Sequence, residues 1–177
     1  MASQTPINRQ EWLKGLPRAF TAASAFITNP AGEVLLVKSY RPHHQFPGGV
    51  IELSEGPEEC AVRETSEELG IELRPGRLLC VSWLTATGTS LEDQPGTQFF
   101  IDLGTIPADT PITLQEDELD SWTWASVERA AELLGPVSAQ RLQACYAARA
   151  DGLTRIVTAS RAEHLTAQFD TEAPDNA

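Results

Sequence analysis

Eight glutamates are crowded into 21 residues of this chain: Glu52, Glu55, Glu58, Glu59, Glu64, Glu67, Glu68 and Glu72. A run of like charges is usually a solvated surface. The spacing indicates a more specific arrangement, because residues 56–69 read as a helix with Pro57 at its first position and Gly70 at its stop. At about 100° per residue, Glu68 lies about 40° from Glu64, and Glu67 lies about 60° on the other side. Three carboxylates therefore share one helix face.

The chemistry that suits three clustered carboxylates is the binding of a hard divalent cation. Like charges three and four residues apart cost an isolated helix roughly a few tenths of a kcal/mol per pair, and a cation would offset that cost. Oxygen ligands favour Mg²⁺ or Mn²⁺, which bridge carboxylates to substrate phosphates. The adjacent arc of the helix is mainly apolar, so the helix can bury one side and present its acids on the other. This arc consists of Ala61, Val62, Thr65 and Leu69.

The loop before the helix adds a second component to the expected site. Gly48 and Gly49 follow Pro47, and glycines let the backbone pass close to a ligand with carbonyls available to a metal. A glycine pair is common in plain turns, so by itself it is a weak signal. In combination with the spaced acids it becomes specific.

The segment 48–71, GGVIELSEGPEECAVRETSEELGI, resembles the Nudix box, G-x5-E-x7-R-E-U-x-E-E-x-G-U, where U is a bulky aliphatic residue. The box covers residues 49–71, and the order of strands around it is similar to that of the family over about residues 18–135. Thr65 departs from the pattern at the first U, a change that affects packing under the helix more than the metal face. The matching positions are Gly49, Glu55, Arg63, Glu64, Glu67, Glu68, Gly70 and Ile71.

The resemblance implies an α/β/α sandwich with a mixed sheet and a loop–helix–loop catalytic motif. It also implies a hydrolase in which water attacks a phosphorus of a pyrophosphate, with Mg²⁺ or Mn²⁺ as Lewis acid and water activator. The implied metal ligands are the carboxylates of Glu64, Glu67 and Glu68 and the carbonyl of Gly49. Arg63 and Glu55 are implied to form an ion pair that orients the helix.

The general base is left open by the resemblance, because its position varies between subfamilies. Glu67 is one candidate, and Glu118 is another because many relatives carry a glutamate in a loop facing the metals. Glu116 is a near alternative to Glu118. Lys38 and Arg41 lead into the site in a protein that has few cations, so we expect them to contact substrate phosphates.

The substrate class is only partly constrained. The secondary markers of ADP-ribose and dinucleoside-polyphosphate enzymes are absent at residues 86–89, which leaves nucleoside triphosphates and nucleotide sugars open. A catalytically silent domain that only binds a nucleotide or metabolite is the alternative. The intact acids of the box favour the hydrolase, because silent domains usually lose one or more of them.

The rest of the chain predicts one compact α/β domain over residues 1–165, followed by a disordered acidic tail at 166–177. Residues 20–28 and 33–40 read as a β-hairpin, and 77–86 and 97–103 as two further strands, while the segment ending in Trp124 is strand-like. Further helices are expected at 8–16, 127–134 and about 138–150, the last beginning at Ser138.

Bulk composition limits the partners. A net charge of −12 disfavours nucleic acid polymers and anionic membranes, so the expected partner is a small phosphorylated nucleotide. Relatives are often dimers, which makes a homodimer one of the expected states. Three widely spaced cysteines, Cys60, Cys80 and Cys145, argue against a disulfide framework or a zinc site. With neither a signal peptide nor a long apolar run, the sequence predicts a cytoplasmic protein.

Overall fold

One mixed β-sheet forms the centre of the molecule in the computed structural model, which describes residues 8–16, 18–86, 94–160 and 163. Its strands run in the order β6-β2-β1-β5-β4-β7, and β3 pairs separately with β1. The β1–β5 and β4–β7 pairs are parallel, and the other pairs are antiparallel. The strands are β1 (Phe20–Thr28), β2 (Val34–Lys38), β3 (Gly48–Val50), β4 (Leu78–Thr85), β5 (Gly96–Thr105), β6 (Ser121–Ala125) and β7 (Arg155–Ser160).

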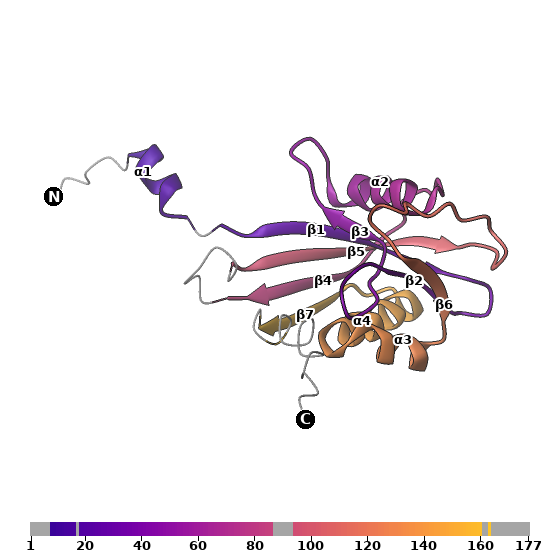
Figure 1. The fold of residues 1–177 in the computed structure, drawn as a ribbon. Coiled ribbons are helices and arrows are strands. Elements are labelled where there is room, and N and C mark those ends of the chain that lie inside the picture. The colour runs from indigo at the N-terminus through magenta and orange to yellow at the C-terminus, as the bar shows by residue number, and fades with distance from the viewer. Residues whose placement is uncertain (1–7, 17, 87–93, 161–162, 164–177) are drawn as a thin grey trace, which may run out of the picture.

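Helices cover both faces of this sheet, which gives the predicted α/β/α sandwich (Figure 1). Helix α2 (Pro57–Leu69) packs on β1, β3 and β5, and helices α3 (Val127–Leu134) and α4 (Pro136–Asp151) pack on the opposite face. Strand residues alternate between the two apolar cores, so that Ala25 and Ile27 face α2 while Phe26 faces α4. Helix α1 (Arg9–Lys14) buries no residue and projects away from the sheet.

The predicted helices and the β1–β2 hairpin are present, with boundaries that differ from the predicted ones by at most two residues. Helix α1 is capped by Asn8, and α3 is capped by Ser126, whose hydroxyl accepts a hydrogen bond from the Arg129 amide. Helix α4 begins at Pro136 and not at Ser138, because proline at the first helical position needs no N–H partner there. Strands β3 and β7 were not expected from the sequence.

The three cysteines are free thiols and buried, in agreement with the prediction of no disulfide framework. None of the described helices combines the length and apolar character that a membrane span requires. The acidic tail at 166–177, for which disorder was predicted, lies outside the described residues.

Candidate metal centre

Helix α2 is fixed on the sheet by its apolar arc, as the sequence predicts. Ala61, Thr65 and Leu69 are fully buried against β1 and β5. The departure from the Nudix pattern at Thr65 is accommodated within the helix, because its hydroxyl donates to the Ala61 carbonyl at 2.7 Å. The threonine therefore leaves no unpaired hydroxyl in the core, and it does not alter the acidic face.

Glu68 is a buried carboxylate held by the glycine loop. Only 7% of the residue is exposed, and its Oε2 accepts a hydrogen bond from the Gly48 amide at 2.9 Å. Burial raises the pKa of Glu68 to about 8, although the Gly48 hydrogen bond acts in the opposite direction. Gly48 has a φ of 144°, and a Cβ there would lie 2.2 Å from the Ala23 carbonyl oxygen. Only glycine can therefore bring this amide to Glu68.

Glu64 lies directly against Gly49. A Cβ at Gly49 would be 2.2 Å from Oε1 of Glu64, so a side chain at this position would displace the carboxylate. Burial also raises the pKa of Glu64, against the effect of its hydrogen bond from Arg63, and the charges of Glu67 and Glu118 add to the increase. The second glycine of the pair thus leaves room for a carboxylate beside a backbone carbonyl.

Arg63 connects the acids of the box, because four of its five N–H donors are directed at Glu55, Glu64 and Glu67. Its Nε and Nη2 donate to the two oxygens of Glu55 at 2.9 and 2.7 Å, which forms a bidentate pair. Its Nη1 donates to Glu64 at 2.9 Å and to Glu67 at 2.8 Å, and Nη2 also approaches the Val50 carbonyl at 3.3 Å. The hydrogen bond to Glu55 is the main cause of the raised pKa of Arg63, and it lowers the pKa of Glu55 to about 2.

Glu118 is brought towards the box by a loop that docks on the end of α2. The Gln115 amide donates to the Glu68 carbonyl at 3.0 Å, and the Glu118 amide donates to the Gln115 carbonyl at 3.1 Å. The charge of Glu118 helps to raise the pKa of both Glu64 and Glu68, after the larger effect of burial. Glu116, the near alternative, lies in the same loop, and both residues are exposed.

The donor set of this face suits a hard divalent cation. Two carboxylates with raised pKa values, those of Glu64 and Glu68, lie beside the Gly48–Gly49 loop, and a cation would favour their charged forms. In the arrangement shown, no three acidic, histidine or cysteine side chains in the described part of the chain converge closely enough to hold a metal. The reason is Arg63, which draws Glu64 and Glu67 to its guanidinium. To bind a cation, these two carboxylates would have to use the oxygens that Arg63 does not hold, or exchange Arg63 for the metal.

Lys38 and Arg41 are not brought to the acids. The Lys38 ammonium donates to the carbonyls of Ser39, at 2.6 Å, and of Arg41. Arg41 approaches the Gln45 side chain at 3.4 Å, and its guanidinium lies 6.0 Å from the ring of the exposed Tyr40. Within the described residues neither cation forms a hydrogen bond or ion pair with the box, and Lys38 stabilises the turn after β2.

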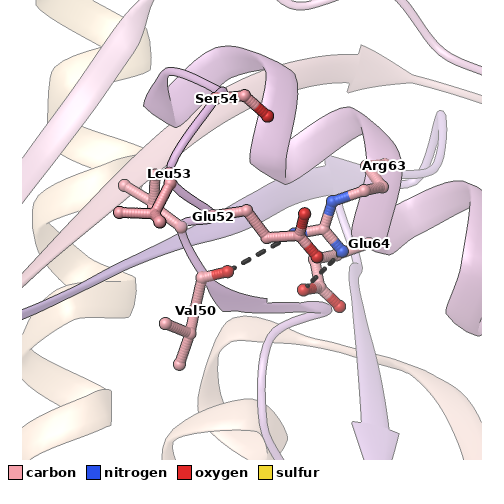
Figure 2. Close-up of a pocket in the computed structure, with 7 residues that line it drawn as sticks. Val50, Glu52, Leu53, Ser54, Arg63 and Glu64 are labelled. Carbon is pink, nitrogen blue, oxygen red and sulfur yellow. Dashed lines mark hydrogen bonds and ion pairs between the residues drawn. The ribbon is translucent and has the colours of Figure 1, made fainter.

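A hollow of about 620 Å³ lies beside Glu64, between the loop 50–54 and α2 (Figure 2). The Glu52 side chain points from this loop towards Arg63 and Glu64, and Leu53 is fully exposed. The sequence did not mark these loop residues, because they occupy the variable positions between the fixed glycine and glutamate of the box. The hollow is lined by Val50, Ile51, Glu52, Leu53, Ser54, Arg63 and Glu64.

Fold and site together define a Nudix protein. The family model of the NUDIX domain matches residues 19–145, and the chain belongs to this family. This confirms the resemblance seen in the box.

Individual relatives agree with this assignment. The RNA pyrophosphohydrolase of Hamiltonella defensa subsp. Acyrthosiphon pisum (strain 5AT) is 46% identical over 54 residues, which are 30% of this chain and 33% of that protein. The match thus spans about a third of that relative. The MutT protein from Methanosarcina mazei Go1 has a TM-score of 0.63 at 22% identity, covering 75% of this chain and 96% of that one. An ADP-ribose pyrophosphatase from Streptococcus suis 89-1591 has a TM-score of 0.59 at 16% identity, covering 80% and 100%. At these identities the two solved structures establish a common fold.

Proposed function

We propose that this chain is a metal-dependent pyrophosphohydrolase acting on a small nucleoside-diphosphate-linked substrate, either a nucleoside triphosphate or a nucleotide sugar. The observation that carries the proposal is the placement of Glu64 and Glu68 against the Gly48–Gly49 loop, with Glu67 on the same helix and Glu118 nearby. Packing alone does not account for such a face, because burial acts against the charged form of its acids.

The residues that would hold Mg²⁺ or Mn²⁺ are Glu64, Glu67 and Glu68, together with the Gly49 carbonyl. Such a cation supplies charge neutralisation for the phosphates and lowers the pKa of a bound water. The water oxygen forms a bond to one phosphorus while the bond from that phosphorus to the bridging oxygen breaks. The products are two phosphate esters, or one ester and inorganic phosphate or pyrophosphate.

The proton released by the attacking water needs an acceptor, and we assign this role to Glu118. In the described part of the chain, the Glu118 side chain makes no hydrogen bond or ion pair, whereas Glu67 is paired with Arg63 at 2.8 Å. A base that is not held by a guanidinium can turn to a water near Glu64 and Glu68. Glu67 then serves mainly as a metal ligand.

The test is turnover of nucleoside triphosphates, nucleotide sugars and dinucleoside polyphosphates by the purified chain with Mg²⁺ and with Mn²⁺. We expect at least one substrate to be hydrolysed in a metal-dependent way, with loss of activity in EDTA. No turnover of the whole panel with either metal would reject the proposal.

A catalytically silent binding domain is the second candidate. It is favoured by one observation, the engagement of one oxygen each of Glu64 and Glu67 by Arg63, which competes with a cation for these carboxylates. If this arrangement persisted in solution, the chain would bind a nucleotide without a metal requirement and would not cleave it. Calorimetric titration of a nucleotide with and without Mg²⁺, alongside the turnover assay, separates the two candidates.

A further inference from the structure

In the arrangement shown, the described residues lining the hollow beside Glu64 offer a phosphate no cation that is free of carboxylate partners. Among the described residues that line it, Glu52 and Glu64 are acidic and Arg63 is the sole cation. All five donors of Arg63 are already engaged, by Glu55, Glu64, Glu67 and the Val50 carbonyl. If a metal drew Glu64 and Glu67 away, Nη1 would lose both of its carboxylate partners, while Glu55 and Val50 would still hold Nε and Nη2.

The same hollow exposes apolar surface that a substrate could cover. Leu53 is fully exposed at the tip of the loop, and 63% of Val50 is exposed at the end of β3. Exposed apolar side chains are common singly, but here two of them flank the acidic face of α2. A ligand group that covers them gains from apolar burial, provided that it carries no negative charge next to Glu52.

The loop that carries these side chains is fixed to the box. The Glu55 carboxylate accepts a hydrogen bond from the Glu52 amide at 2.9 Å, and Arg63 donates to the Val50 carbonyl at 3.3 Å. The start of the loop, at Val50, and its middle residue, Glu52, are therefore tied to the Arg63–Glu55 pair. The hollow is a formed feature beside the metal-binding face, and it does not need a substrate to shape it.

We propose that this hollow receives the group on the far side of the cleaved pyrophosphate from the nucleoside, and that this group is an uncharged one such as a sugar. The inference rests on the proposed hydrolase activity, and it selects nucleotide sugars over nucleoside triphosphates. A triphosphate would place its terminal phosphate beside Glu52, with Arg63 as the one basic residue among the described residues lining the hollow, whereas a sugar would contact Leu53 and Val50 and donate hydroxyl hydrogens to Glu52.

The experiment compares kcat/KM for UDP-glucose and UTP, and for ADP-glucose and ATP, so that each pair shares its nucleoside. In the pair that is hydrolysed faster, we expect kcat/KM of the wild type to be at least ~10-fold higher for the nucleotide sugar than for the triphosphate. Glu52→Lys should reduce this ratio of kcat/KM values by roughly tenfold, because one charge is reversed next to a phosphate. Leu53→Ser should lower kcat/KM for the sugar substrate by roughly threefold or more, through lost apolar contact, with little effect on the triphosphate. Glu72→Lys, the same charge reversal at an exposed position outside the hollow, should leave the ratio unchanged.

The outcomes separate this inference from the proposed activity. Equal use of both substrates, a preference for the triphosphate, or a ratio unaffected by Glu52→Lys overturns the role of the hollow while hydrolysis stands. Absence of turnover overturns the proposed activity, and the role of the hollow is then decided by calorimetric Kd values of UDP-glucose and UTP with the wild type and with Glu68→Gln. A preference for UDP-glucose that Glu52→Lys removes would support it, and equal or absent binding would overturn it.

Discussion

Glu64 and Glu68 would supply the negative charge that binds a metal, although burial disfavours the charged form of both carboxylates. Replacing either by glutamine removes a metal ligand and several kcal/mol of transition-state stabilisation, so we predict a loss of turnover of at least ~100-fold in Glu64→Gln and in Glu68→Gln. Both variants should remain folded, because a repulsive cluster is relieved. Steady-state kinetics and circular dichroism check the two parts. Near-normal activity in both variants would remove these residues from the metal site.

Glu118 and Glu116 allow a matched comparison within one loop. If Glu118 accepts the proton from water, Glu118→Gln should lower kcat by roughly 10²- to 10⁴-fold. Glu116→Gln removes the same charge from an exposed neighbour in the loop. It should lower kcat by less than threefold, as expected of a surface substitution that has no specific role. Similar kcat values for the two variants would exclude Glu118 as the base and return the role to Glu67.

The Glu55 carboxylate gives a prediction of acid sensitivity. Its hydrogen bonds from Arg63 and from the Glu52 amide lower its pKa from an ordinary value of 4.5 to about 2. The folded state therefore binds this proton less readily than the unfolded state, so the stabilisation is present above about pH 4.5 and is lost as the pH falls towards 2. We expect the difference in unfolding free energy between wild type and Glu55→Gln to shrink between pH 5 and pH 2.5 in urea titrations. A difference that is constant with pH would mean that the pair does not persist in solution.

At the scale of elements, Arg63 connects α2 to the preceding loop. Its side chain is 26% exposed and that of Glu55 is 11% exposed, so the pair is partly shielded from water. We predict that Arg63→Ala lowers the free energy of unfolding by about 1–3 kcal/mol, between the values of exposed and buried pairs. Activity should fall as well, because the loop and three carboxylates lose their common partner. Thermal melting and kinetics measure the two effects.

Arg129 provides the control for this variant. Its pair with Glu132 lies on the surface of α3, with both side chains more than 60% exposed. Arg129→Ala should therefore change the melting temperature little and leave activity intact. If Arg63→Ala behaved in the same way, the hydrogen bonds of Arg63 would contribute no more to stability than an exposed surface pair.

The elements that could be predicted are those whose signals are local. Helix α2 is marked by Pro57, by the spacing of its apolar arc and by Gly70, which adopts a φ of 66° at the helix end. Strand β3 carries no such signal, because two of its three residues are glycines and it becomes a strand only by pairing with β1. Strand β7 also depends on a distant partner, since it pairs in parallel with β4.

The features of the site also divide into those set by the local sequence and those set by tertiary contacts. The helical spacing predicts that Glu64, Glu67 and Glu68 share a face, because that depends on the helix alone. The partners of these acids depend on tertiary structure, so the engagement of Glu64 and Glu67 by Arg63 could not be predicted from spacing. The use of Lys38 in the turn after β2 could not be predicted either, because a lysine near a site has the same sequence signature whether its ammonium meets substrate or backbone carbonyls.

At the scale of the whole molecule, which has a net charge of −12, binding of a metal would affect stability as well as catalysis. The folded state gathers Glu64, Glu67 and Glu68 on one face, whereas the unfolded chain does not. A cation that binds only the folded state therefore stabilises it, by about 2.7 kcal/mol when its concentration is 100 times its dissociation constant. Because few ligands besides carboxylates hold the ion in the absence of substrate, binding should be weak, and millimolar Mg²⁺ should be required.

The prediction is tested by melting the wild type and a Glu64→Gln/Glu68→Gln double variant, first with EDTA and then with Mg²⁺. The wild type should gain stability with the metal, and the double variant should be at least as stable as the wild type in EDTA and should gain nothing from Mg²⁺. If the metal displaces Arg63 from Glu64 and Glu67, part of its effect in the wild type offsets the loss of these contacts, so the gain should be larger when a nucleotide supplies phosphate ligands. A wild type that is indifferent to millimolar Mg²⁺, with and without a nucleotide, would mean that Arg63 outcompetes the cation. The silent binding domain would then be the better description of this chain.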